Sequence, residues 1–310
     1  MKRLLLFVLV SVMLLSLLAS CNAPQESGSE TESETESETE WAPAPNPASD
    51  FEYGLMVGGE TIAITKYIGT ETTVVLPSEI EGKPVTWIGM EFDPNDVIES
   101  LYIPASLENI DSQAFMGNES LRVLCFEERD RPIKIWQEAF YDCPNLEKLE
   151  LPAYTVLYGG AFRFCPSIKE IFIPNTVDFE GYAPFTGVKS LEKVVLEDGI
   201  TALDVDTLFV RPHSLKSITI PASVIEMDCD VFFLSFALES ITFLGDAPAL
   251  VTTDPWKETV ELYSNDDIMI NYDYEHITDR VIIYYDPATK GWDTFAYDTE
   301  AYVLVPLPAA

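Results

Sequence analysis

The sequence has few basic residues and few of the side chains that enzymes commonly use for catalysis. Lys and Arg number 18 against 52 Asp and Glu, so the formal net charge is −34. An acidic surface repels phosphate backbones, which argues against a nucleic-acid partner. The two histidines, His213 and His276, lie in no metal-binding spacing, and no GxSxG, phosphate-loop or GxGxxG motif is present. We therefore expect no enzyme activity and no cofactor.

One acidic cluster near the C-terminus is the remaining candidate for a metal site. Its carboxylates, which are the hard oxygen ligands that calcium prefers, are Asp266, Asp267, Asp273, Glu275 and Asp279. The cluster lacks the spacing and the glycine of a known calcium loop, so a solvated acidic face is the favoured interpretation. We expect no metal.

The N-terminus is typical of an exported protein. A basic pair at 2–3 precedes the apolar run Leu4–Leu18, which is short for a membrane-spanning helix of ~20 residues. The tetrapeptide LASC at 18–21 resembles the lipobox of bacterial lipoproteins, which implies cleavage before Cys21 and a diacylglyceryl thioether on its sulfur. Two acyl chains suffice for stable membrane anchoring. The alternative is an ordinary secretory signal followed by a chance cysteine.

The segment after Cys21 is predicted to be disordered. Residues 29–40 repeat SETE three times, and WAPAPNPASD follows at 41–50. Such a sequence has little to bury and repels itself, so it should remain extended. Between a lipid anchor and a folded domain it would act as a tether, with a passive acidic tail as the alternative.

A heptapeptide such as LEKLELP (146–152) or LKSITIP (215–221) recurs along the chain. Its first apolar residues are spaced by 23, 25, 22, 23, 24 and 23 residues. They are Ile98, Leu121, Leu146, Ile168, Leu191, Leu215 and Leu238. Further apolar residues follow at +3 and +5, and a second series keeps the same period: Phe115, Phe140, Phe162, Phe185, Phe209 and Phe232. Two apolar series with one period predict a solenoid.

The period also indicates how each coil is built. The alternation within the heptapeptide predicts one short strand per coil, and stacked strands would pair in parallel ~4.8 Å apart. Proline commonly follows the strand, at 104, 152, 174 and 221, where its missing N–H ends the ladder. The Ala-Phe segment that follows is expected to form one helical turn with its Phe packed inward.

These residues resemble the BspA-type leucine-rich repeat, of pattern LxxIxIPxxVxxIxxxAFxxCxxL, over about 51–245. The resemblance implies a leucine-rich repeat solenoid: a parallel β ladder of about seven to eight short strands, short helical turns on the opposite side, and caps at both ends. It also implies a bacterial surface protein, since several members are associated with adhesion. Two coils depart from the pattern: Glu127 and Glu197 replace proline, and the first of these coils has a longer middle, EERDRPIKIWQ.

Five segments follow from these observations. A Gly58-Gly59 pair joins two alternating runs and predicts a hairpin over the first, degenerate coil. Residues 255–277 are interpreted as an insertion in the C-terminal region. The expected organisation is a signal peptide (1–20), an acidic and Pro-rich tether (21–50), an N-terminal cap with a degenerate coil (51–97), leucine-rich repeats (98–245) and a C-terminal capping region (246–310).

Four cysteines remain beyond Cys21. Cys143 and Cys165 occupy the same repeat position in consecutive coils, which places their Cα atoms within disulfide range. A small buried residue is equally suited to this position, and we favour two free thiols. Cys125 lies between two inward residues and is expected to face outward, and Cys229 has no clear partner.

The outward side of the ladder is the candidate binding face. Outward residues two apart along each strand include aromatic and aliphatic side chains in neighbouring rungs, with lysines beside them. The candidates are Tyr102, Lys148, Glu150, Phe172, Lys193 and Val195. An exposed apolar patch ringed by charge is typical of an interaction site. The alternative is that such residues merely suit strands.

Anchor, tether and solenoid, in that order, favour a lipid-anchored protein on the extracellular face of a bacterial membrane. It would bind a protein or glycoprotein at a cell or matrix surface. Two other functions stay open at this point: a secreted hydrolase with an unrecognised site in 246–310, and a structural envelope protein without a specific ligand.

Overall fold

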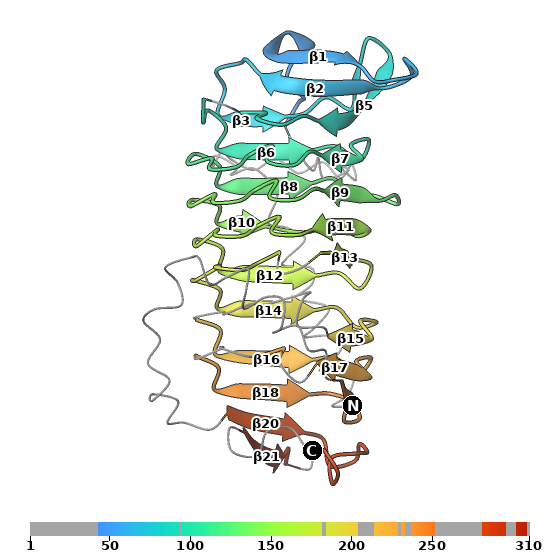
Figure 1. Cartoon of the computed structure of the whole chain (residues 1–310), viewed down its shortest axis with the longest axis vertical. Helices are drawn as coiled ribbons and strands as arrows, with labels where there is room; N and C mark the ends of the chain where they lie inside the picture. Colours follow the sequence, from blue (N-terminus) through green and yellow to red (C-terminus); the bar gives the residue numbers. More distant parts are fainter. Residues whose placement is uncertain are drawn as a thin grey trace, which may run out of the picture.

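The computed structural model describes residues 43–93, 95–181, 184–203, 214–228, 231–232, 237–251, 281–295 and 302–308. Coils stack along one axis in these residues, with the N-terminal coils at one end (Figure 1). The signal peptide, Cys21, most of the tether, both histidines, Phe209, Cys229, the acidic cluster and the 255–277 insertion lie outside the described residues.

The first side of each coil contributes a strand to what we call the front ladder. Its strands are β3 (Thr73–Val75), β6 (Ser100–Ile103), β8 (Val123–Phe126), β10 (Lys148–Leu149), β12 (Glu170–Ile173), β14 (Lys193–Leu196), β16 (Ser217–Ile220), β18 (Ser240–Phe243), β20 (Val281–Tyr285) and β21 (Tyr302–Pro306). Strands pair in parallel and in register within three runs, β3 to β10, β12 with β14, and β16 to β21, so that Leu101 lies opposite Leu124 and Ile218 opposite Ile241. This confirms the predicted parallel ladder.

A second strand in most coils forms what we call the side ladder, so the expectation of one strand per coil was wrong. Its strands are β2 (Ile62–Tyr67), β5 (Lys83–Ile88), β7 (Asn109–Ile110), β9 (Ile133–Ile135), β11 (Thr155–Tyr158), β13 (Asp178–Glu180), β15 (Ala202–Leu203), β17 (Glu226–Asp228) and β19 (Ala249–Val251). The short β4 (Glu79–Ile80) pairs with β5 in antiparallel fashion. Many of these strands are only two or three residues long, which is too short for an alternation pattern to indicate.

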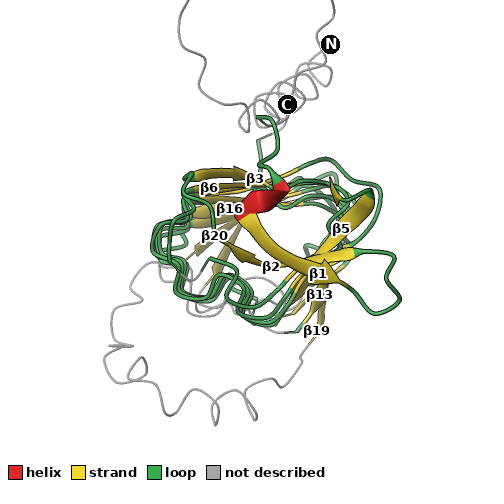
Figure 2. Cartoon of the chain, turned by 90° about the horizontal axis from the view of Figure 1, so that it is seen from above, coloured by secondary structure: helices red, strands yellow, loops and turns green. Residues whose placement is uncertain are grey.

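The Ala-Phe segments lie in turns, and the loops on the third side of the stack, which we call the turn side, are seen end-on in Figure 2. These segments are turns, and the only helix among the described residues is the 3₁₀ turn η1 (Ala48–Asp50) outside the repeats, so the expected helical turns are not observed. The N–H of Phe140 donates to the carbonyl of Ala161 in the next coil at 2.8 Å, and the N–H of Phe162 donates to that of Pro184 at 2.9 Å. Backbone donors that a helix would use internally therefore join neighbouring coils.

A column of phenylalanine rings runs through the core behind these turns. Ring centroids lie 5.0 Å apart for Phe115 and Phe140, 5.1 Å for Phe140 and Phe162, and 5.7 Å for Phe162 and Phe185, with nearly parallel planes. All four rings are buried, as are the first apolar residues of the coils. Burial of both apolar series, in the described part of the chain, confirms the inward positions that the period predicts.

Both ends of the stack differ from its middle. β1 (Phe51–Leu55) pairs in antiparallel fashion with β2, and the connecting Gly58 and Gly59 have φ angles of +105° and +73°, which glycine adopts easily. At the other end, β20 and β21 add parallel rungs to the front ladder. Residues 281–285 and 302–306 thus continue the ladder beyond 245, where the leucine-rich repeats were expected to end.

Two cysteines lie in the core as free thiols, as the sequence favours. The sulfur of Cys143 donates to the carbonyl of Phe115, and that of Cys165 to the carbonyl of Phe140, each at 3.1 Å. The neighbouring Cys165 thiol and burial raise the pKa of Cys143. The thiol form is therefore favoured, and these residues act as small core side chains.

Replacing Phe162 with Ala tests the phenylalanine column. The ring is fully buried between two others, so its loss should cost about 3–5 kcal/mol of unfolding free energy. Denaturant unfolding followed by circular dichroism measures this cost. Phe164→Ala in the same coil is the matched control, because Phe164 is only half-buried on the turn side and should cost less. Equal costs for the two variants would contradict a special role for the column.

Candidate protein-interaction face

The outward residues of the front ladder form columns along the solenoid. Tyr102 lies opposite Cys125 in the pairing of β6 with β8, and Phe172 lies opposite Val195 in the pairing of β12 with β14. Register within the ladder therefore brings together side chains that are about one repeat apart in the sequence. The column is not uniform, and its two ends differ in exposure.

The N-terminal part of this column is closed. Tyr102 is 7% exposed and Cys125 is fully buried, and both belong to a small cluster with Val75 that is separate from the main core. Burial raises the pKa of Tyr102. Both residues lie outside the main core, as the alternation along the strand predicts, but they are buried there rather than exposed to solvent, which removes Tyr102 from the open binding face.

The central part of the column is more open. Phe172 and Val195 are half-buried on neighbouring rungs, and two lysines lie two residues before the outward column. Lys148 forms an ion pair with Glu150 at 3.9 Å, and Lys193 forms one with Glu170. Burial lowers the pKa of Lys148. The lysines are thus balanced by carboxylates on the same face.

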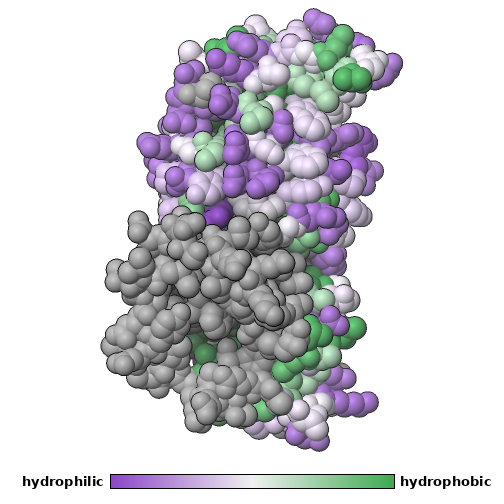
Figure 3. All heavy atoms as spheres, in the orientation of Figure 1, coloured by the Kyte–Doolittle hydropathy of each residue, from purple (hydrophilic) through white to green (hydrophobic). Residues whose placement is uncertain are grey.

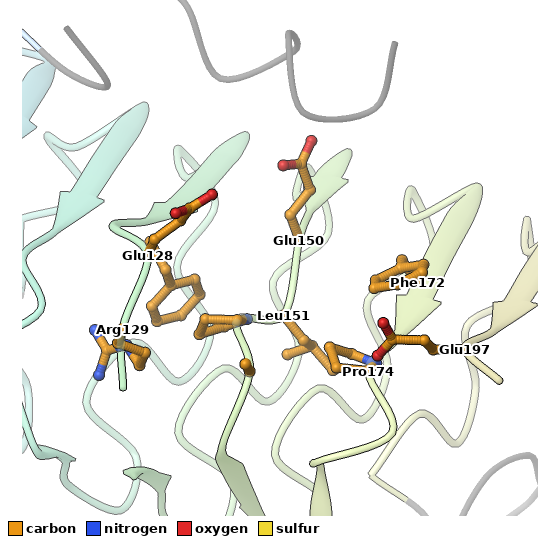
Figure 4. A pocket seen from close by; sticks show the side chains of 10 residues that line it. Glu128, Arg129, Glu150, Leu151, Phe172, Pro174 and Glu197 are labelled. Carbon is orange, nitrogen blue, oxygen red and sulfur yellow. The ribbon is translucent and has the colours of Figure 1, made fainter. Parts of the chain in front are cut away.

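A pocket of about 440 Å³ opens beside Phe172 (Figure 4). It contains two aromatic rings, two prolines and three carboxylates. The lining residues are Phe126, Glu128, Arg129, Glu150, Leu151, Pro152, Ala153, Phe172, Pro174 and Glu197. Of the predicted candidates, Glu150 and Phe172 line this pocket, whereas the others lie elsewhere on the front ladder. Phe126 packs against the main core, as expected, but it is only half-buried and also forms part of the pocket wall.

The pocket exists because one rung of the front ladder is short. β6 and β8 pair over four residues, but β10 pairs with β8 only through Lys148 and Leu149. Glu150 and Leu151 leave the ladder one rung after the longest coil, and Pro152 follows without an N–H to give. The strand end that is missing there leaves the hollow between β8 and β12.

The two glutamates that replace proline have a structural task in these coils. Glu127 accepts a hydrogen bond from the N–H of Ala105 at 2.7 Å, and Glu197 accepts one from the N–H of Asn175 at 2.9 Å. In both cases the donor lies one coil earlier, directly after a proline. The N–H of Glu127 also donates to the carbonyl of Ile103, a bond that proline cannot form. The departures therefore keep the coils joined.

Arg129 holds the long loop of this coil against its neighbour. Its guanidinium donates to the carbonyls of Leu107 at 2.8 Å and Pro104 at 3.0 Å, and it lies 5.9 Å from the ring centroid of Phe126. Burial lowers the pKa of Arg129 to about 10, so it remains a cation at neutral pH. The guanidinium is thus directed to these carbonyls. The carboxylates of Glu150 and Glu197 lie on the other side of the pocket (Figure 4).

In the view of Figure 3, hydrophilic side chains predominate around the N-terminal coils, while apolar side chains are visible at the N-terminal tip and along the right edge of the lower half. The described residues contain no cluster of three or more His, Cys, Asp or Glu that could hold a metal. They also include no helix that is long and apolar enough to cross a membrane. The acidic cluster at 266–279 lies outside the described part of the chain, as does most of the C-terminal region of the hydrolase alternative.

Sequence reasoning missed most of the pocket. Its outer members lie at strand ends and in the loop after Phe126, which the repeat pattern does not cover. A signal was nevertheless present, because the coil that starts at Leu121 is the longest, at 25 residues, and lacks its proline. An irregular coil in a regular array indicates where the surface changes shape.

A family model of the BspA type leucine rich repeat region matches six copies, at residues 88–208 and 133–250. The chain belongs to this family. A leucine rich cell surface protein of Faecalibacterium prausnitzii A2-165 is similar in structure, with a TM-score of 0.51 and 26% identity; the match covers 67% of this chain and 56% of that one. A leucine rich repeat protein of T. pallidum is also similar, with a TM-score of 0.44 and 24% identity; the match covers 71% of this BspA-type chain and 95% of that one. Curated proteins give no match.

Removing the carboxylate of Glu127 tests its bond to the preceding coil. Glu127→Ala leaves the N–H of Ala105 without its acceptor, which should cost about 1–3 kcal/mol of unfolding free energy. Glu127→Gln should lose less, because its amide oxygen still accepts. Chemical unfolding of both variants beside Glu128→Ala, the adjacent pocket carboxylate, measures the difference. If Glu127→Ala and Glu128→Ala lower the unfolding free energy equally, the hydrogen bond between Glu127 and Ala105 does not stabilise the fold.

Proposed function

We propose that the chain is a lipid-anchored surface protein that binds a protein partner through the central part of the front ladder. The observation that carries this proposal is the pocket, in which the rings of Phe126 and Phe172 lie among three carboxylates. Apolar surface rimmed by charge is typical of interaction sites. Membership of a family of repeat proteins supports a binding role over a catalytic one.

The charge of the pocket favours a basic partner. Glu128, Glu150 and Glu197 line it, and the whole chain has a net charge of −34. Complementary charge steers association and disfavours acidic partners. A protein or glycoprotein that presents Lys or Arg next to apolar side chains fits this chemistry. The aromatic rings would supply much of the binding free energy, since aromatic residues are common among interface hot spots.

The N-terminal sequence supports a location on the cell surface. LASC at 18–21 matches a lipobox, and the acidic segment that follows would hold the solenoid away from the membrane. The tether was expected to extend to residue 50, but Asn46 exchanges hydrogen bonds with the backbone of Val75 at 2.8 and 2.9 Å, so residues 46–50 belong to the solenoid. The remaining segment, 22–45, would reach ~27 Å as a flexible coil and ~80 Å when fully stretched. The F. prausnitzii relative is described as a cell surface protein, which agrees with this location.

Replacing Phe172 with Ser tests the binding face. A partner is first captured from cell extracts or matrix proteins with the full chain, and its dissociation constant is then measured by calorimetry. Loss of one buried aromatic contact should weaken binding by about 2 kcal/mol or more, which is about 30-fold. Phe164→Ser on the turn side is the matched control and should bind as the parent does, after circular dichroism shows that both fold. Unchanged affinity for Phe172→Ser would place the partner elsewhere.

Replacing Cys21 with Ala tests the anchor. The cysteine sulfur is the atom that the lipobox predicts to be lipidated, so the variant should lose its acyl chains and leave the membrane fraction. Cell fractionation followed by immunoblotting, with Ser20→Ala as the control, measures this. A Cys21→Ala protein that stays in the membrane fraction at the parental level would show that lipid on Cys21 is not the anchor.

A further inference from the structure

A second pocket, of about 380 Å³, lies on the side ladder and is separate from the interaction face proposed above. It spans four coils and has an aromatic wall, a floor of glycines and a polar rim. Its lining residues are Ser112, Trp136, Gln137, Glu138, Tyr158, Gly159, Gly160, Arg163, Glu180 and Gly181. Its volume lies at the lower end of the range for small-ligand sites, about 300–1,000 Å³.

The aromatic wall is a stack that ends inside the pocket. The rings of Trp136 and Tyr158 lie 4.3 Å apart with an interplanar angle of 11°. On the Trp side the stack is occupied: the indole N–H donates to Asn109 at 3.1 Å, and the ammonium of Lys134 lies 5.7 Å from the ring centroid. On the other side, Tyr158 lies opposite Glu180 in the next rung, and within the described residues, which omit 182 and 183, no third ring continues the stack.

Glycines keep the floor of the pocket free of side chains. Gly181 has a φ of +138°, and a Cβ placed there would lie 2.7 Å from the backbone nitrogen of Gly159. Gly160 has a φ of +68°. Because the backbones of Gly159 and Gly181 pack so closely, only glycine fits at 181, and backbone rather than side chain lines this part of the pocket.

The rim offers both donors and acceptors. Glu138 and Glu180 provide carboxylate oxygens, while Arg163, Gln137 and Ser112 provide donors. The amide of Gln113 donates to Glu138 at 3.0 Å, which orients that carboxylate. Such a rim suits a ligand whose polar groups both donate and accept, rather than a simple ion of either sign.

We propose that this pocket binds one pyranose unit of a carbohydrate. A pyranose has a flat face of C–H groups that can stack on Tyr158 as the third member of the aromatic column. It also has a ring of hydroxyls, each a donor and an acceptor, that matches the mixed rim. A cationic ligand is disfavoured because Arg163 lines the pocket and Lys134 already lies against the same aromatic stack.

Saturation-transfer NMR on the purified full chain tests the proposal. The probes are glucose, galactose, mannose and N-acetylglucosamine, with their α- and β-linked oligosaccharides and an arginine-containing tetrapeptide. At least one saccharide should receive saturation at its ring C–H protons. If no saccharide of the set receives saturation, the proposal is wrong. It is also wrong if the tetrapeptide binds in a way that depends on Tyr158 and no saccharide binds.

Variants at the aromatic wall then locate the site, with calorimetry as the measurement. Tyr158→Ala should weaken saccharide binding at least tenfold, equivalent to about 1.4 kcal/mol, whereas Tyr158→Phe should stay within about threefold of the parent. Tyr154→Ala removes an exposed tyrosine of the same coil that does not line the pocket, and it should change nothing. Equal binding by Tyr158→Ala and the parent would overturn the proposal.

The two binding proposals can fail separately because they use different ladders. Phe172→Ser should leave saccharide binding unchanged, and Tyr158→Ala should leave the affinity for a captured protein partner unchanged. A saccharide that loses binding in Phe172→Ser and not in Tyr158→Ala would belong to the front pocket and would contradict the assignment to the side ladder.

Discussion

No single coil of this protein can bury its own apolar residues, so every coil depends on the ones that stack against it. The inward faces of Phe140 and Phe162 are covered by the rings of neighbouring coils at 5.0–5.7 Å, and their backbone N–H groups find acceptors in the next coil. Within each run of paired strands, the front and side ladders form hydrogen bonds between coils, and backbone N–H groups on the turn side do the same. Stability in such a stack comes from nearest-neighbour contacts, and a defect in one coil is felt by the next.

The same dependence explains how the surface can vary while the stack persists. In the coil of Glu127 the proline is replaced and the middle is longer, yet Phe140, Cys143 and Leu146 remain buried in their columns. The glutamate carboxylate bonds to the previous coil, and Arg129 binds two carbonyls of that coil. With the core columns kept, the outer end of the next strand is free to leave the ladder and open the pocket beside Phe172.

Much of the fold was predictable because its main signal is periodic. Each inward position is repeated many times, so chance matches average out, and the parallel pairing follows from one strand every 22–25 residues. The side ladder and the turns were not predictable in the same way. Strands such as β7 and β15 have two residues, and such short segments show no alternation; they are strands only because a neighbouring coil supplies their hydrogen bonds. The Ala-Phe segments form turns rather than helical turns because the N–H groups of their phenylalanines bond to the next coil. The sequence of one coil does not show these acceptors.

The sequence by itself determined the period, the inward columns, the acidic character and the candidate face with Phe172 and Val195. Only the tertiary structure decided which outward residues are accessible. Tyr102 and Phe172 have equivalent positions in the repeat, yet the first is closed by Val75 and Cys125 while the second borders a pocket. The stack of Trp136 on Tyr158 was likewise invisible in the sequence. The exposure of an outward side chain depends on the side chains one coil away and on where the neighbouring strands end. The sequence pattern of a single coil gives no information on either.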